Sequence, residues 1–154
     1  MIKAFTHGAG YILPILRASD RWVAPAVDVA ARFWMASVFF KSGLTKTANW
    51  DNTLMLFEYE YGVPILPTEV AAYMATAGEL ILPWLLVFGF GARIGALGLL
   101  VMTLVIEFLV YPGTTEHYYW MLLLGAIAAR GPGLYSVDAW LRRSQARRQQ
   151  DATR

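Results

Sequence analysis

The sequence predicts an all-α integral membrane protein, a bundle of four transmembrane helices with both termini on the cytoplasmic side. Three observations support this fold class. Hydrophobic residues make up 57% of the 154 residues and charged residues only 16%, whereas a soluble domain averages about 25% charged residues. Apolar segments long enough to cross a bilayer recur along the chain. Most lysines and arginines lie at one set of segment ends.

The first 23 residues are expected to form a cytoplasmic or interfacial lead-in. Their apolar run, Tyr11 to Leu16, is interrupted by Pro14. It is shorter than the roughly 20 residues that a transmembrane helix needs. No small-residue cleavage pattern follows it, so the sequence does not indicate a secretory signal.

Four segments are predicted to cross the membrane. They comprise residues 24–44, 68–88, 94–111 and 114–130. At 1.5 Å per residue, each is long enough for a hydrocarbon core of about 30 Å, the fourth only just. The turn at Gly89-Phe90-Gly91 makes the connection between the second and third spans a tight one.

The connection at residues 45–67 is the longest and most acidic one. It is expected to hold a short helix at Thr53–Tyr61, capped by Asp51 or Asn52. Helix breakers follow this segment at Gly62, Pro64 and Pro67.

The distribution of basic residues predicts the orientation of the spans. One side of the membrane would hold Lys3, Arg17, Arg21, Arg93, Arg130, Arg142, Arg143, Arg147 and Arg148. The other side would hold Lys41 and Lys46. Because loops rich in Lys and Arg stay in the cytoplasm, the first group is predicted to be cytoplasmic. Both termini then lie inside, which requires an even number of spans.

The chain is expected to divide into a transmembrane domain, residues 1–140, and a basic cytoplasmic tail, residues 141–154. The residues Ser136-Val137-Asp138 indicate the start of a helix before the tail. An amphipathic tail of this kind would lie on the anionic inner leaflet, attracted by about 1 kcal/mol per basic residue. The alternative is a solvated tail whose charges serve only to set the topology.

Charged residues inside the spans need partners, because each costs about 2.5–3.5 kcal/mol on insertion scales. Arg32 and Glu79 lie ~12 Å and ~14 Å from the inner boundary at 1.5 Å per residue, and are predicted to form an ion pair. Asp28, one turn before Arg32, is placed to share it. Lys41 points the opposite way from Arg32 and is expected to extend to the outer headgroups.

A second polar site is predicted nearer the outer face. Glu107 would lie ~20 Å from the inner side of the third span. Lys46 and His117 are its available partners. The small residues Gly95 and Gly98 on the same span predict a close approach between helices.

These intramembrane charges allow two interpretations. In the first, they are structural pairs that hold the helices together. In the second, Arg32 with Glu79, or Glu107 with His117, lines a polar pocket for a quinone headgroup, a proton path or a small substrate.

Several other classes of function are excluded or unsupported. The chain has no cysteine, which excludes disulfides, thiolate metal sites and dithiol chemistry by the chain itself. It has no phosphate-binding glycine loop, zinc-protease helix motif or nucleophile elbow. No metal site is predicted from its two histidines, and its basic residues lack the aromatic interleaving of a nucleic-acid platform.

An ordered set of short motifs resembles the DoxX family over about residues 28–140. The stretch from Arg32 to Lys46 contains Phe39-Phe40-Lys41-Ser42-Gly43-Leu44-Thr45-Lys46, which is similar to the family's first helix. The further segments that resemble the family are, in chain order, Gly62-Val63-Pro64, Ala77-Gly78-Glu79, Gly89, Arg93-Ile94-Gly95-Ala96 and Gly131-Pro132-Gly133-Leu134-Tyr135-Ser136-Val137-Asp138.

This resemblance implies a small four-helix protein of the bacterial inner membrane. By position, it carries over the polar residues Arg32, Lys46, Glu79 and Arg93. It implies an accessory subunit of a quinone-linked redox system, with other membrane or redox subunits, or further copies of itself, as partners in the bilayer. The alternative is a non-catalytic scaffold or transport factor for a metal-peptide or stress-response pathway. The chain itself supplies no cofactor and no catalytic motif, so any catalysis would belong to an oxidoreductase complex, with a quinone as the ligand.

Overall fold

The computed structural model describes residues 19–62, 64 and 66–152, and every regular element in these ranges is helical. The proposed lead-in lies largely outside the described residues. The α-helices are α2 (Ala24–Ala48), α3 (Trp50–Met55), α4 (Thr68–Phe88), α5 (Ala92–Val105), α6 (Thr115–Arg130) and α7 (Val137–Ala152). Wider π-type turns precede α2 at Ser19–Val23, extend α3 through Leu56–Tyr61, and extend α5 through Ile106–Val110.

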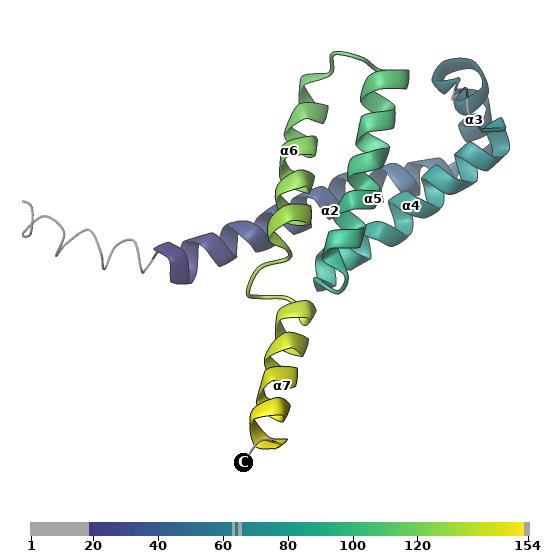
Figure 1. The fold of residues 1–154 in the computed structure, drawn as a ribbon. Coiled ribbons are helices and arrows are strands. Elements are labelled where there is room, and N and C mark those ends of the chain that lie inside the picture. Colours follow the sequence, from purple (N-terminus) through teal and green to yellow (C-terminus); the bar gives the residue numbers. More distant parts are fainter. Residues whose placement is uncertain (1–18, 63, 65, 153–154) are drawn as a thin grey trace, which may run out of the picture.

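Four helices pack into one body, from which α7 extends (Figure 1). In this body α2 contacts α4, α4 contacts α5, α5 contacts α6, and α6 contacts α2. We call the end that holds Ala24, Phe88, Ala92, Arg130 and α7 the basic end. The opposite end, which holds α3 and residues 56–67, is called the acidic end.

The core of the body is small, and much of the apolar surface faces outward. Buried residues from all four helices form it, with Phe39, Leu86, Leu99 and Leu124 among the largest. Only 28% to 33% of the residues are buried in the most apolar stretches of α2, α4 and α5 with its extension. Helices that are apolar on all sides and exposed on most of them are suited to a lipid environment.

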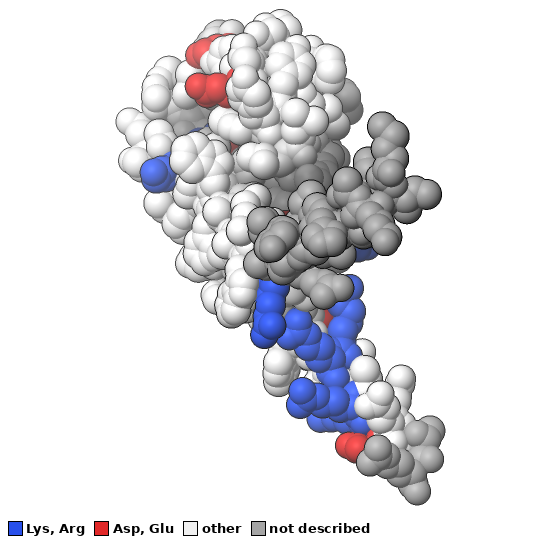
Figure 2. Space-filling model, turned by 90° about the vertical axis from the view of Figure 1, so that its left-hand side faces the viewer, with Lys and Arg blue, Asp and Glu red and all other residues white. Residues whose placement is uncertain are grey.

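Charged side chains are concentrated at the two ends of the molecule. Figure 2 shows basic residues along α7 and where it leaves the body, acidic residues at the opposite end, and a broad, largely uncharged surface between. Large exposed apolar side chains on this surface include Trp34, Ile81, Ile94 and Phe108. An uncharged band between two polar ends is the surface that a bilayer requires.

The small residues of α5 allow it to lie close to α4, as the sequence predicted. A Cβ added at Gly98 would lie 2.6 Å from Leu82 Cδ1. One added at Gly95 would lie 2.8 Å from Leu86 Cδ1 and 3.1 Å from the backbone oxygen of Leu82. A side chain at Gly95 would therefore push the two helices apart, whereas one at Gly98 would first displace the end of the Leu82 side chain.

The start of α7 is joined to the turn between α4 and α5. The amide of Asp138 donates to Gly89 O at 3.0 Å, and Asp138 Oδ1 accepts from the amide of Gly91 at 3.0 Å. Gly89 has φ +64° and Gly91 has φ +59°, a left-handed conformation that favours glycine. The tight turn predicted at residues 89–91 is therefore also the attachment point of the C-terminal helix.

The helix boundaries match the second predicted span and lie within two residues of the third and fourth, whereas the first differs more. The first helix continues to Ala48, four residues beyond the predicted end of the span. The described residues contain three helices long and apolar enough to cross a membrane, namely Arg21–Ala48, Thr68–Phe88 and Ala92–Val110. With 16 residues, α6 is shorter than these, so the fourth span stays a prediction.

The expectations about the long connection and about the C-terminal tail need correction. The helix in the long connection begins at Trp50, and its cap is Asn49, whose side chain accepts from the amide of Asn52 at 3.0 Å. Neither Asp51 nor Asn52 is the cap, because both already lie within the first turn.

The large apolar residues of α7 lie in its first five positions, so the expected amphipathic character does not extend along the tail. The helix also continues through residue 140, and the division of the chain there stays a prediction.

The two glycines of this turn make a matched pair for mutation. A Cβ at Gly89 would lie 2.5 Å from both Arg32 Nη1 and Ser136 Cβ, whereas one at Gly91 would meet nothing within 4 Å. We expect Gly91→Ala to cost about 1–2 kcal/mol for the left-handed conformation alone. Gly89→Ala should cost at least about twice as much. The free energy of unfolding in mixed micelles would measure both, and equal losses would contradict the close packing at Gly89.

Candidate functional site

A buried ion pair joins α2 to α4 in the half of the body nearer the acidic end. Lys46 Nζ donates to the two carboxylate oxygens of Glu79 at 2.9 and 2.8 Å. Ser42 Oγ donates to Glu79 Oε1 at 3.1 Å and accepts from Lys46 Nζ at 2.9 Å. The side chains of Lys46 and Glu79 are 13% and 3% exposed. Two side chains thus hold one carboxylate through three hydrogen bonds in an otherwise apolar contact between helices.

The predicted pair of Arg32 with Glu79 is wrong, although their depth along the helices is similar. Side chains on a helix lean toward its N-terminus. Because α2 and α4 are antiparallel, Arg32 leans toward the basic end and Glu79 toward the acidic end. Lys46 lies further along α2 and leans back toward Glu79, so these two side chains converge. The prediction compared backbone depth and left out this lean.

Arg32 instead holds the basic end together. Its Nη1 donates to Leu86 O at 3.1 Å, and its Nη2 donates to Tyr135 O at 2.6 Å. The side chain is buried, and its Nε has no hydrogen-bond partner among the described residues. Hydrogen bonds from a charged donor contribute roughly 1.5–3 kcal/mol each. The guanidinium therefore ties α2 to the last turn of α4 and to the segment that leads into α7.

The remaining residues of the predicted intramembrane site also lie at the basic end. Asp28 interacts electrostatically with Arg32, as its spacing predicted, but forms no ion pair with it within 4.0 Å. Arg93 is exposed, and its Nη2 donates to Arg130 O at 3.4 Å. The structure therefore separates the predicted set into Lys46 with Glu79, and Arg32 with Asp28 and Arg93.

A second buried pair joins the end of α5 to α6. His117 Nδ1 lies 2.8 Å from Glu107 Oε2, and the amide of Gly113 donates to Glu107 Oε1 at 2.7 Å. Both side chains are less than one-tenth exposed. Glu107 lies in the π-type turn at Ile106–Val110, a widened geometry that is frequent at functional sites. Of the two partners predicted for Glu107, the structure selects His117, because Lys46 is held by Glu79.

Aromatic residues pack against one another at the acidic end of the body. The ring of Tyr61 contacts Phe57 at 4.8 Å and Tyr111 at 5.9 Å between centroids. The Tyr111 hydroxyl in turn donates to Glu60. Burial, followed by the negative charges of Glu60 and Glu79, raises the pKa of Tyr61. The Tyr61 hydroxyl therefore stays protonated and can act as a hydrogen-bond donor on this side of the body.

The structure adds residues that the sequence did not single out. Ser42 is part of the Glu79 cluster, and its position four residues before Lys46 on a helix was the available signal. Thr76 lies one turn before Glu79 on α4, and its Oγ1 is buried with no hydrogen-bond partner among the described residues. Thr103, by contrast, donates to Leu99 O at 2.8 Å. Thr76 thus presents an unsatisfied hydroxyl close in sequence to the buried carboxylate.

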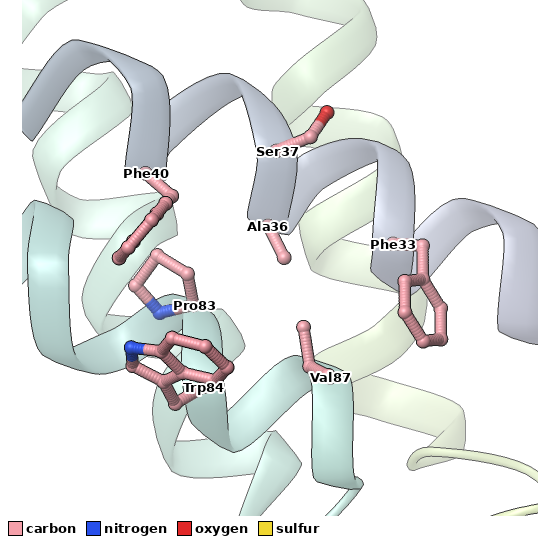
Figure 3. A pocket seen from close by; sticks show the side chains of 7 residues that line it. All are labelled: Phe33, Ala36, Ser37, Phe40, Pro83, Trp84 and Val87. Atoms are coloured by element: carbon pink, nitrogen blue, oxygen red, sulfur yellow. The ribbon is translucent and has the colours of Figure 1, made fainter. Parts of the chain in front are cut away.

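A shallow apolar groove of about 140 Å³ lies on the outer surface between α2 and α4. Figure 3 shows Phe40 beside Trp84 at one end, and Phe33 with Val87 at the other. At 100° per residue, Ser42 points about 160° away from Phe40 around α2. The groove therefore faces away from the Glu79 cluster and is a separate surface.

Comparison with known proteins identifies the family. A model described as DoxX matches residues 27–112, more than half of the chain. The chain belongs to the DoxX family. This DoxX chain is also 27% identical over 123 residues to an uncharacterized protein of Haemophilus influenzae, covering 73% of this chain and 81% of that protein. No solved structure matches it.

Family membership confirms the resemblance predicted from the sequence. Together with the three apolar helices, it makes the chain a multi-pass membrane protein that lies in a lipid bilayer. The matched region includes Arg32, Lys46, Glu79 and Glu107. It ends before His117 and before Tyr135, whose backbone oxygen accepts one of the two hydrogen bonds of Arg32.

The reassigned ion pair is testable by a double-mutant cycle. Removing one partner of a buried pair leaves an uncompensated charge, so Lys46→Met and Glu79→Leu should each cost about 3–5 kcal/mol. The combined variant should be more stable than either single one. Coupling between Arg32→Met and Glu79→Leu should be below about 0.5 kcal/mol, because these side chains share no partner.

The free energy of unfolding in mixed micelles would be measured for each variant. Lys41→Met is the control, because Lys41 lies on the same helix and is exposed. A strong coupling of Glu79 to Arg32, with none to Lys46, would restore the original pairing and refute the new one.

Proposed function

We propose that this DoxX chain is an accessory subunit of a quinone-linked redox system in the bacterial inner membrane. In this proposal it spans the membrane four times, with both termini in the cytoplasm. Its buried polar groups near the acidic end would hold a quinone headgroup and exchange protons with it.

The proposed topology rests on the packing of α6 and on the distribution of charge. Although α6 is only ~24 Å long at 1.5 Å per residue, it packs against both α5 and α2, which are long apolar helices. A span shorter than the bilayer core is accommodated by local thinning at a modest cost. Arg93 at the start of α5, Arg130 at the end of α6 and the arginines of α7 lie at the basic end, which the positive-inside rule assigns to the cytoplasm.

The observation that carries the proposed ligand site is the unsatisfied hydroxyl of Thr76. A buried polar group without a partner costs about 1–3 kcal/mol, so it indicates a ligand or water at that position. A quinone carbonyl is a hydrogen-bond acceptor and would satisfy it. Glu79, one turn after Thr76 on α4, is paired with Lys46, and His117 is paired with Glu107; both pairs carry exchangeable protons.

The roles of the residues follow from their chemistry. A quinone supplies two-electron chemistry coupled to proton uptake. In this site Thr76 would donate a hydrogen bond that orients the ligand, and His117, held in place by Glu107, would pass a proton. Tyr61, packed between Phe57 and Tyr111, would help to exclude water that enters the site from the acidic end.

The electrons would have to come from a partner subunit. The chain has no cysteine, and it lacks the motifs typical of a flavin or nucleotide site. A partner carrying flavin, haem or thiols is therefore part of the proposal. Membership of this DoxX chain in a larger assembly would also explain why much of its apolar surface is exposed, because other membrane subunits would contact that surface.

A second candidate is a non-catalytic membrane scaffold or transport factor. The saturation of the two carboxylates favours it, since Glu79 accepts three hydrogen bonds and Glu107 is held by His117 and by the amide of Gly113. Fully paired charges of this kind can serve only to hold helices together.

Thr76 gives a direct test of the quinone proposal. The protein would be purified in mild detergent, and quinone in its lipid extract would be quantified together with the absorption spectrum of any co-purifying subunit. We expect bound quinone in the natural sequence and a roughly tenfold lower content in Thr76→Val. The variant should be at least as stable as the natural protein, because it removes an unsatisfied hydroxyl.

Thr103→Val is the matched control, because it removes a buried hydroxyl of the same type that already has a partner. This control should lose some stability and keep its quinone. A preparation with neither quinone nor a coloured partner would refute the redox proposal and leave the scaffold. Equal quinone contents in Thr76→Val and the natural protein would refute the assigned role of Thr76.

A further inference from the structure

A hollow of about 470 Å³ lies at the basic end, where α7 leaves the body. Its walls come from the start of α2, the end of α6, the following loop and the first turns of α7. The lining residues are Ala24, Pro25, Asp28, Arg130, Gly133, Leu134, Ala139, Arg142 and Arg143. Its volume lies within the range of about 300–1,000 Å³ that is common for ligand sites. This hollow is remote from the proposed quinone site, which lies toward the acidic end.

The charge of the lining favours an anion. Three arginines face one aspartate, and neither ion pair among the described residues involves any of them. Asp28 is the one lining residue that would repel an anion, and the positive charge of the buried Arg32 acts on it from the side of the core. Arginine guanidinium groups match the geometry of phosphate oxygens, so an unpaired arginine cluster around a hollow fits a phosphate group.

The walls of the hollow are held in place by contacts already described. The hydrogen bonds of Asp138 with Gly89 and Gly91 anchor the first turn of α7. Arg142 Nε donates back to Asp138 O at 3.2 Å. Arg32 ties α2 to the segment just before α7 through Tyr135 O. The arginines of α7 are therefore presented from a fixed helix start.

Exposed aromatic residues lie within two residues, along the chain, of residues that line the hollow. Trp22, Tyr135 and Trp140 are 61%, 58% and 66% exposed. Tryptophan and tyrosine gather at the boundary between hydrocarbon and headgroups in membrane proteins. Leu134 lines the hollow and is also half exposed. A basic hollow at this level would meet the phosphate groups of the bilayer directly.

From these observations we propose that the hollow binds the phosphate of an anionic phospholipid headgroup. Arg130, Arg142 and Arg143 would hold the phosphate, and the exposed aromatic residues would lie among the neighbouring glycerol and acyl groups. A free phosphate ion offers the same oxygens, but it would make no use of the aromatic and leucine side chains around the opening. The bound lipid would link α6 to α7 and so fix α7 at the membrane surface.

The test uses the full chain in detergent and native mass spectrometry. Binding would be titrated with phosphatidylglycerol, with phosphatidylcholine and with inorganic phosphate. We expect phosphatidylglycerol to bind at least about tenfold more tightly than phosphatidylcholine. The variant Arg142→Gln with Arg143→Gln should weaken phosphatidylglycerol binding about tenfold, since basic residues near a membrane surface each contribute to anionic lipid binding.

The matched control is Arg147→Gln with Arg148→Gln, which removes the same charge from the same helix outside the hollow. It should change the affinity less than about twofold. Arg130→Gln, on a different helix, should weaken binding several-fold and keeps the test valid if the α7 variant detaches that helix. All variants should keep the melting temperature measured without added lipid.

Three outcomes would overturn the proposal. Equal losses in the two double variants would mean that the tail attracts anionic lipids without a site. Equal affinity for phosphatidylglycerol and phosphatidylcholine would exclude recognition of the anionic headgroup. Binding of inorganic phosphate as tight as that of the lipid would assign the hollow to a soluble anion.

Discussion

Buried charges in this protein must be satisfied by groups of the same chain, and this constraint organises its structure. The cost of leaving a charge unpaired in an apolar surrounding far exceeds that of a lost van der Waals contact. Glu79 is therefore held by Lys46 and Ser42, and Glu107 by His117 and a backbone amide. Both ion pairs cross from one helical segment to another, so they also determine which helix faces make contact.

The basic end follows the same rule with a different type of partner. The guanidinium of Arg32 is paired mainly with two backbone oxygens, one at the end of α4 and one before α7. Gly89 has no side chain at the point where a Cβ would strike Arg32. A buried cation, a glycine turn and the hydrogen bonds of Asp138 to that turn therefore form one connected structure. The hollow between α6 and α7 lies directly beside it.

The proposed functions are located at opposite ends of this framework. The acidic end combines two groups of exchangeable protons with an unsatisfied hydroxyl, which is suited to a polar ligand inside the bilayer. The basic end presents unpaired arginines and exposed aromatic residues, which are suited to the headgroups of the membrane surface. Because one body of helices connects them, a partner subunit bound at the membrane surface would lie at a constant distance from the buried site.

The sequence by itself determined the all-helical fold, the membrane location and the family, because apolar length and charge distribution act locally along the chain. It also named His117, only ten residues from Glu107, as one of two partners for that carboxylate. Only the tertiary structure decided that Glu79 pairs with Lys46 and that Arg32 belongs to the other end. The reason is directional: side chains on antiparallel helices lean in opposite directions, so residues at equal depth diverge and residues at different depth converge. The unsatisfied Thr76 and the hollow beneath α7 likewise exist only once distant segments have packed together.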